Sequence, residues 1–196
     1  MQNPSSGPLL VLASRSPRRI DLLRRIGREP VVDPADIDES MNEGESAVDY
    51  VQRVSREKAL TVLARHPGAV VLGADTCVEL DGVVHGQPAD RDDARRILRT
   101  LSGRTHNVHT GVTVAIAAAG ATASRTIVES ARVTLQPLGE TLLDWYLDTG
   151  EPFGKAGAYA VQGHGAVLVT GVRGLMSGVV GLPLGPVAGL LEEFGV

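Results

Sequence analysis

Residues 69–80, Ala-Val-Val-Leu-Gly-Ala-Asp-Thr-Cys-Val-Glu-Leu, form the most strand-like stretch of the chain. Their apolar and β-branched side chains indicate a buried strand, and Asp81-Gly82 predicts a tight turn into a second strand at Val83-Val84. The stretch also contains a carboxylate, Asp75, at a position where an apolar strand has no need of one. It therefore predicts both the centre of a sheet and a candidate site.

Outward from this strand, short apolar runs alternate with helical patterns, which predicts an α/β fold. Strands are expected at residues 9–13, 69–80, 83–84 and 106–116, with a turn and a paired strand that ends near residue 135. Helices are expected at residues 17–26, 47–63, 90–101 and 140–147. No repeat or linker divides the chain, so we expect a single domain over residues 1–196.

Capping residues mark the expected helix ends. Ser16 precedes Pro17 at the start of the first helix, and Ser46 with Asp49 forms a capping pair at the second. The segment 30–42 is acidic and predicts a loop. Residues 150–196 hold 12 of the 23 glycines, which predicts many tight turns in this part of the chain.

Composition excludes several classes of function. The net charge of −4 argues against binding to nucleic acid or to an anionic membrane, both of which need a basic excess. The single cysteine, Cys77, can form no intramolecular disulfide and fits a reducing compartment. No apolar run reaches 18 residues, and the first residues lack the pattern of a secretory signal. We therefore expect a soluble, cytoplasmic protein.

The stretch Ser14-Arg15-Ser16-Pro17-Arg18-Arg19 lies at a predicted strand-to-helix turn. The free N–H groups at a helix start suit an anion such as phosphate. Arg18 and Arg19 oppose the helix dipole there, at about 0.3–1 kcal/mol each, and a bound polyphosphate would offset this cost. The alternative is that both arginines lie in water as ordinary surface charge.

Asp75 is the second candidate. A carboxylate in an apolar strand must be paired, bind a metal or face a cleft, because its burial alone is costly. It could orient a water molecule or bind a divalent cation, and an edge position turned to solvent is the alternative. Further metal oxygens could come from the acidic loop, although solvated side chains are the alternative for most of them. The carboxylates of this loop are Asp36, Asp38, Glu39, Glu43 and Glu45.

Lys58 is the third candidate, because it lies in the middle of the apolar face of the predicted helix 47–63. A lysine at such a position either extends along the surface to water or reaches a cleft to meet an anion.

The segment Gly150-Glu151-Pro152-Phe153-Gly154-Lys155-Ala156 is similar to a phosphate-binding P-loop. It is one residue too short, however, and has Ala where Ser or Thr would hold a metal. By this pattern alone it supports no function.

Taken together, seven segments resemble the Maf (septum-formation-inhibitor-like) family of nucleoside triphosphate pyrophosphatases. They are Leu12–Arg19, Glu57–Ala59, Gly73–Thr76, Leu101–His106, Thr110–Val112, Lys155–Tyr159 with Gln162-Gly163, and Gly181–Pro183. The resemblance implies an elongated mixed β-sheet flanked by helices, with two lobes around a nucleotide-binding cleft. It also implies a homodimer, a divalent cation (Mg²⁺ or Mn²⁺), and hydrolysis of a nucleotide to the monophosphate and pyrophosphate.

The resemblance assigns roles to individual residues. Asp75 matches the general base. The metal is expected at Asp75 together with Glu39 of the acidic loop. The residues that match the triphosphate cradle are Ser14, Arg18, Arg19 and Lys58. Lys155, in the matching Lys-Ala-Gly segment, is expected to bind the substrate. Arg18, Thr76 and Gln162 match the specificity residues of the subfamily that acts on dTTP and UTP. Gln87, Gly154 and Gly178 depart from the family, which usually has Lys, Asp and Asn at these positions.

The expected function is therefore hydrolysis of dTTP and UTP, and of modified pyrimidine nucleotides, to the monophosphate and pyrophosphate. The alternative is a nucleotide-binding regulator of cell division with weak or no turnover. Gln87 and Gly154 motivate this alternative, because each removes a charge that the family usually carries.

Overall fold

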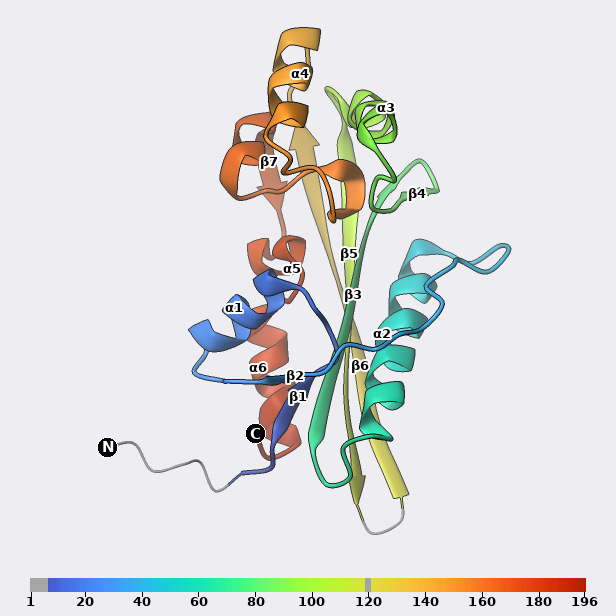
Figure 1. Ribbon diagram of the computed structural model, residues 1–196, viewed down its shortest axis with the longest axis vertical. Coiled ribbons are helices and arrows are strands. Elements are labelled where there is room, and N and C mark those ends of the chain that lie inside the picture. Colours follow the sequence, from blue (N-terminus) through green and yellow to red (C-terminus); the bar gives the residue numbers. More distant parts are fainter. Residues whose placement is uncertain (1–6, 119–120) are drawn as a thin grey trace.

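The computed structural model describes residues 7–118 and 121–196, and its centre is one mixed sheet with the strand order β2-β1-β3-β5-β6-β7. A further strand, β4, pairs with β3 outside this order. The strands are β1 (Leu10–Leu12), β2 (Val31–Val32), β3 (Val70–Leu80), β4 (Val83–His85), β5 (Thr105–Ala118), β6 (Ala121–Leu135) and β7 (Val169–Arg173). The long strands β3, β5 and β6 run through the whole molecule and give it an elongated shape (Figure 1).

Helices surround this sheet at two levels (Figure 1). Around its lower half lie α1 (Pro17–Arg25), α2 (Ala47–Leu63), α5 (Met176–Val180) and α6 (Leu184–Glu193). Around its upper half lie α3 (Arg91–Leu101) and α4 (Glu140–Asp148), with the 3₁₀ helices η1 (Ala156–Ala158) and η2 (Gly163–Leu168). We call these two levels the lower lobe and the upper lobe. Among the described residues, no helix combines the length and the apolar character needed to cross a bilayer.

The expected α/β class and the elements of the first 148 residues are confirmed. Ser46 caps α2 as predicted: its Oγ accepts from the amide of Asp49 at 3.1 Å. Ser16 occupies the N-cap position of α1, but its side chain makes no capping bond. The strand β2 lies within the segment predicted as loop. The turn predicted directly after residue 116 is wrong in part, because β5 continues to Ala118 and β6 begins at Ala121, and residues 119–120 lie outside the described residues.

Two clusters of buried apolar side chains lie on the same face of the sheet. In the lower lobe, Leu72 and Ala74 of β3 pack with α1 and α6. In the upper lobe, Val78 and Leu80 of β3 pack with α3 and α4. Since alternate residues of a strand share a face, Thr76 lies on this face between the two clusters. The polar residue thus marks the boundary between the lobes.

One edge of β3 is open at the same level. It pairs with β1 as far as Leu72, and β4 pairs with it only from Val78 onward. Within the described residues no strand covers this edge at Asp75 and Thr76. Asp75 and Thr76 point to opposite faces of the strand, and the open edge lets both reach one cleft.

On the other face, α2 approaches the sheet unusually closely at two glycines. A Cβ at Gly73 would lie 2.3 Å from the carbonyl oxygen of Ser55, and one at Gly111 would lie 2.2 Å from that of Val51. Gly111 is also the β5 partner of Asp75. The close packing therefore places the middle of α2, and with it Lys58, beside Asp75.

Candidate functional site

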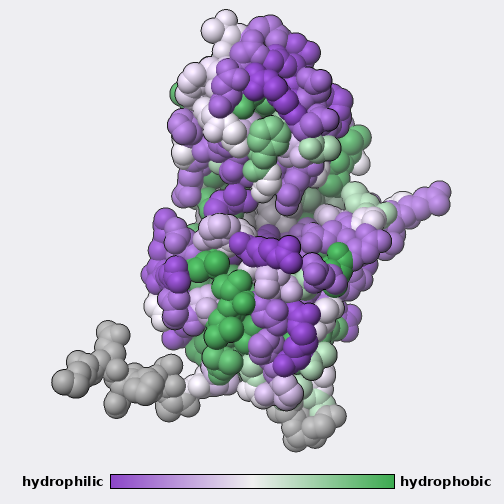
Figure 2. Space-filling model, in the orientation of Figure 1, coloured by the Kyte–Doolittle hydropathy of each residue, from purple (hydrophilic) through white to green (hydrophobic). Residues whose placement is uncertain are grey.

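A pocket of about 510 Å³ lies at the open edge of β3, between the two lobes. Figure 2 shows the surface hollowed at this level, with hydrophilic side chains along the lower margin of the hollow. All nine residues that the sequence predicts for the site line this pocket, and they come from both lobes. They are Ser14, Arg18, Arg19, Glu39, Lys58, Asp75, Thr76, Lys155 and Gln162.

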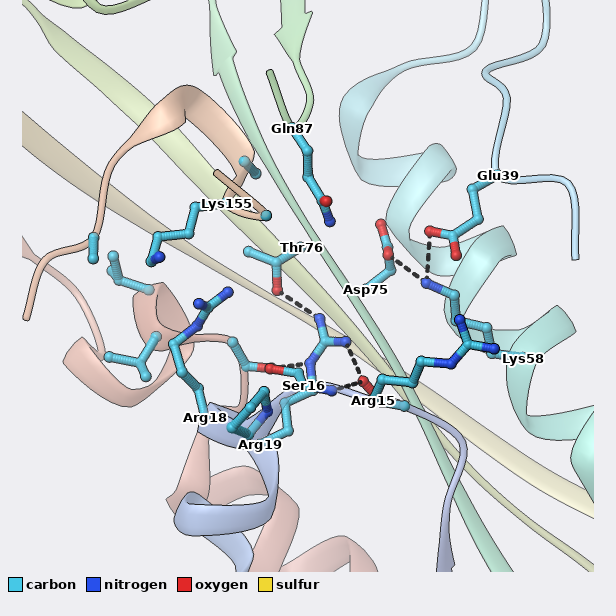
Figure 3. Close-up of a pocket in the computed structure, with 18 of the residues that line it drawn as sticks. Arg15, Ser16, Arg18, Arg19, Glu39, Lys58, Asp75, Thr76, Gln87 and Lys155 are labelled. Carbon is cyan, nitrogen blue, oxygen red and sulfur yellow. Dashed lines mark hydrogen bonds and ion pairs between the residues drawn. The ribbon is translucent and has the colours of Figure 1, made fainter. Parts of the chain in front are cut away.

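Arg19, in the first turn of α1, forms the floor of the pocket (Figure 3). Its guanidinium donates to the carbonyl of Gly181 at 3.0 Å and to the hydroxyls of Ser14 and Thr76, each at 3.1 Å. Burial lowers the pKa of Arg19, an effect that the nearby Asp75 carboxylate opposes. Because its three bonded partners are neutral and a guanidinium has five N–H donors, Arg19 retains capacity to bind an anion.

A chain of hydroxyls fixes the orientation of Thr76. Thr110 of β5 donates to the carbonyl of Gly178 at 2.9 Å, so its oxygen accepts from the Thr76 hydroxyl, 2.9 Å away. The hydroxyl of Thr76 thus accepts from Arg19 and donates to Thr110. It can only accept any further hydrogen bond.

Lys58 reaches the cleft and joins two carboxylates. Its Nζ lies 2.8 Å from Oδ1 of Asp75 and 2.7 Å from Oε2 of Glu39 (Figure 3). The side chains of Lys58 and Asp75 are each only 9% exposed, which excludes both a snorkelling lysine and a solvent-facing aspartate. A buried carboxylate needs such a partner, because an unpaired charge in the interior is strongly destabilising.

The donor set fits a magnesium-like ion. In the described part of the chain no group of three or more His, Cys, Asp or Glu side chains could enclose a metal. Mg²⁺ is commonly held by one or two carboxylates together with substrate phosphates, so it needs no such enclosure. The carboxylates of Asp75 and Glu39 both accept from Nζ of Lys58, so they lie close together, and each has one oxygen that does not bond to Lys58.

The opposite wall of the pocket carries two cations, Arg18 and Lys155, which extend toward each other (Figure 3). Burial lowers the pKa of Arg18, and burial together with the Arg18 charge lowers the pKa of Lys155. Within the described residues Arg18 makes no side-chain hydrogen bond or ion pair, and the Lys155 ammonium donates to the backbone carbonyl of Glu151. This wall has an excess of positive charge, which suits a polyphosphate.

The residues that depart from the family also lie in or near the pocket. Gln87 extends its side chain into it, and Gly154 lies on its margin with φ of +70°. Gly178 lies behind it, where its carbonyl accepts from Thr110.

Sequence reasoning missed Thr110 and Glu151 as supports of this site. The signal for Thr110 is available in the strand pattern, since it shares a face with the apolar series Val108, Val112 and Val114. A polar side chain in such a buried series needs a specific partner. Glu151 carries no comparable pattern in the sequence.

Comparison with known proteins agrees with this geometry. A family described as Maf-like protein matches residues 9–194. A dTTP/UTP pyrophosphatase of Myxococcus xanthus (strain DK1622) is 50% identical over 188 residues, which cover 96% of this chain and 93% of the relative. The proteins of the same name from Anaeromyxobacter dehalogenans (strain 2CP-C) and Symbiobacterium thermophilum are 52% and 44% identical. These matches cover 96% and 95% of this chain, and 95% and 94% of the relatives.

The sequence motifs and the arrangement of the sheet agree with these matches, which extend over nearly the whole length of the chain. The chain therefore belongs to the Maf-like protein family.

Proposed function

We propose that this protein is a nucleoside triphosphate pyrophosphatase that hydrolyses dTTP and UTP to the monophosphate and pyrophosphate. The observation that carries the proposal is a pocket in which a buried carboxylate, Asp75, faces cations from both lobes. The names of the relatives, dTTP/UTP pyrophosphatases, support the same reaction and the same pyrimidine nucleotides.

The triphosphate binds among the cations of the two lobes. Arg19 and Ser14 offer donors from the start of α1, and Arg18 and Lys155 provide charge from the opposite wall. Held between these groups, the phosphates are oriented and their charge is partly neutralised before reaction. No single residue carries this binding, so its loss on any one substitution is partial.

Asp75 acts as the general base. Its carboxylate accepts a proton from a water molecule, which attacks the α-phosphorus. The bond from this phosphorus to the bridging oxygen breaks, and pyrophosphate leaves with that oxygen. Lys58 holds the Asp75 carboxylate in place throughout. Asp75 and Glu39 would hold a divalent cation, Mg²⁺ or Mn²⁺, which would supply charge neutralisation for the phosphates.

The side-chain amide of Gln162 recognises the base by hydrogen bonding. The amide can donate and accept, which matches the carbonyl and the N3–H of a pyrimidine edge. A purine is larger, so its second ring would keep its hydrogen-bonding edge from reaching the same position. The amide would then lose its partners, at a cost of about 1–3 kcal/mol. We therefore expect dTTP and UTP to exceed dGTP and 7-methyl-GTP by roughly ten-fold or more in kcat/KM.

The test is a substrate screen with the purified protein. dTTP, UTP, dGTP and 7-methyl-GTP are incubated with Mg²⁺ or Mn²⁺, and pyrophosphate release and nucleotide binding are both measured. Pyrophosphate release with a pyrimidine preference supports the proposal. Tight binding of dTTP or UTP without release would instead favour the nucleotide-binding regulator.

The homodimer and the cytoplasmic location expected from the sequence stay predictions. Sedimentation velocity tests the first, since a homodimer has twice the 20.6 kDa mass of the chain.

A further inference from the structure

The segment between Gly150 and Gly165 carries two of the predicted substrate-binding residues, Lys155 and Gln162, on backbone with little regular structure. Only the short 3₁₀ helix η1 and the start of η2 interrupt it. Gln162 itself is exposed and lines the pocket, so its amide needs support from elsewhere to face a ligand in one orientation.

This support comes from the side chain of Glu151. Its Oε1 accepts from the backbone amide of His164 at 3.1 Å, and its Oε2 accepts from that of Gly165 at 2.6 Å. The Glu151 side chain is only 15% exposed. Both of its oxygens are therefore used on the turn that directly follows Gln162.

The turn is built tightly against this carboxylate. Gly163 has φ of +77°, and a Cβ there would lie 2.2 Å from Oε1 of Glu151. Only glycine combines this backbone conformation with so close an approach. A turn fitted this closely to one side chain depends on the length of that side chain as well as on its charge.

Glu151 is itself held at the end of α4. Its backbone amide donates to the hydroxyl of Thr149 at 3.1 Å, and its backbone carbonyl accepts from the ammonium of Lys155. The backbone of Glu151 thus anchors Lys155, whereas its side chain holds the turn after Gln162. A side-chain substitution separates these two effects.

We propose that Glu151 is a positioning residue for nucleotide selectivity, which acts by holding the turn 163–165 so that the Gln162 amide faces the base. The proposal rests on the proposed function, because it assigns Gln162 to the base of a bound nucleotide. Glu151 contacts neither the base nor the reacting phosphates and acts through Gln162.

Two substitutions of Glu151 distinguish an effect of its charge from its positioning of the turn 163–165. Glu151→Gln removes a negative charge near Arg18 and Lys155, and this change strengthens binding of every triphosphate alike. It also replaces one of the two carboxylate oxygens, which accept from the turn, by an amide group that donates. Glu151→Asp keeps the charge but shortens the side chain by one methylene. If Glu151 positions the turn, both substitutions lower the ratio of kcat/KM for dTTP to that for dGTP. If it contributes only charge, neither substitution changes this ratio.

The experiment measures the dTTP to dGTP ratio of kcat/KM for the parent, Glu151→Gln, Glu151→Asp, Gln162→Ala and Glu151→Gln/Gln162→Ala. Glu192→Gln, an exposed position of α6 outside the pocket, is the matched control. We expect each Glu151 variant to lower the ratio at least five-fold, mainly through a higher KM for dTTP. In the Gln162→Ala background, Glu151→Gln should change the ratio less than two-fold.

An unchanged ratio in a folded Glu151 variant would overturn the proposal, as would an equal change with and without Gln162. If Glu151→Gln does not fold, Glu151→Asp decides alone by the same ratio. A parent protein that releases no pyrophosphate from any nucleotide would instead refute the proposed function, so the two failures are distinguishable.

Discussion

The ion-pair cluster of Lys58, Asp75 and Glu39 allows a quantitative prediction for Lys58→Met. The substitution keeps the length of the side chain but removes the ammonium that lies 2.8 Å from Asp75 and 2.7 Å from Glu39. Removal of one partner from a fully buried pair costs about 3–5 kcal/mol. The Glu39 side chain is 46% exposed and therefore screened by water, so we expect a loss of about 2–4 kcal/mol.

For a domain of this size, such a loss lowers Tm by about 4–16 °C. The matched control is Arg56→Met, an exposed position on the same helix. Thermal unfolding is followed by circular dichroism without and with saturating Mg²⁺. The variant leaves two carboxylates without their cation, so Mg²⁺ should raise its Tm more than that of the parent. Equal Tm values for Lys58→Met and Arg56→Met would refute the reasoning, because the buried pair would then contribute no stability.

Three further predictions concern the departures from the family, the base and pH. Gln87→Lys should raise kcat/KM for dTTP, because it adds a cation to the pocket. Gly154→Asp should raise the affinity for Mg²⁺ but lower Tm, since Gly154 has φ of +70°. Lower turnover in both variants would show that the site binds phosphate differently. Gln162→Glu should reduce the dTTP preference over dGTP by about ten-fold, since it removes an amide donor, and an unchanged preference in steady-state kinetics would remove Gln162 from base recognition. Burial lowers the pKa of His106 to about 4, so the unfolded chain binds its proton more readily, and stability should fall by on the order of 3 kcal/mol between pH about 6.5 and about 4. Urea unfolding at several pH values checks this, and His106→Gln should show a weaker pH dependence if the reasoning is correct.

The sequence predicted most of the fold because local patterns and long-range packing agree in the first three quarters of the chain, up to the end of α4. The Asp81-Gly82 turn is an example: both residues have positive φ, and the turn joins β3 and β4 as expected. The helix α2 begins at its predicted cap for the same reason. Where local signals are weak, prediction failed. The helices α5 and α6 contain Gly178, Gly185 and Gly189, whose low helix propensity hides them, and packing against the sheet stabilises them instead.

The candidate site shows the same division. Three site residues could be identified from the sequence: Asp75, Lys58 and Arg19. Each carries a charge at a position where the local pattern requires an apolar or oppositely charged residue. Their meeting in one pocket could not be deduced from spacing, because it depends on the open edge of β3 and on the close approach of α2. The supporting contacts of Thr110 and Glu151 are made to backbone groups distant in sequence, at Gly178 and at residues 164–165. Such contacts leave little trace in a single sequence.

Pyrophosphate release with Asp75 as general base is tested by product analysis of the parent and Asp75→Asn with dTTP and Mg²⁺. Asp21→Asn, on the exposed side of α1, is the control. Asparagine keeps the size of Asp75 but cannot accept the proton of the attacking water. We expect equal amounts of dTMP and pyrophosphate from the parent and from Asp21→Asn. For Asp75→Asn we expect a turnover about 10²–10⁴-fold lower, with dTTP binding partly retained. Turnover of Asp75→Asn within a few-fold of the parent would contradict the role of Asp75 as general base, and release of orthophosphate in place of pyrophosphate would contradict the pyrophosphatase reaction.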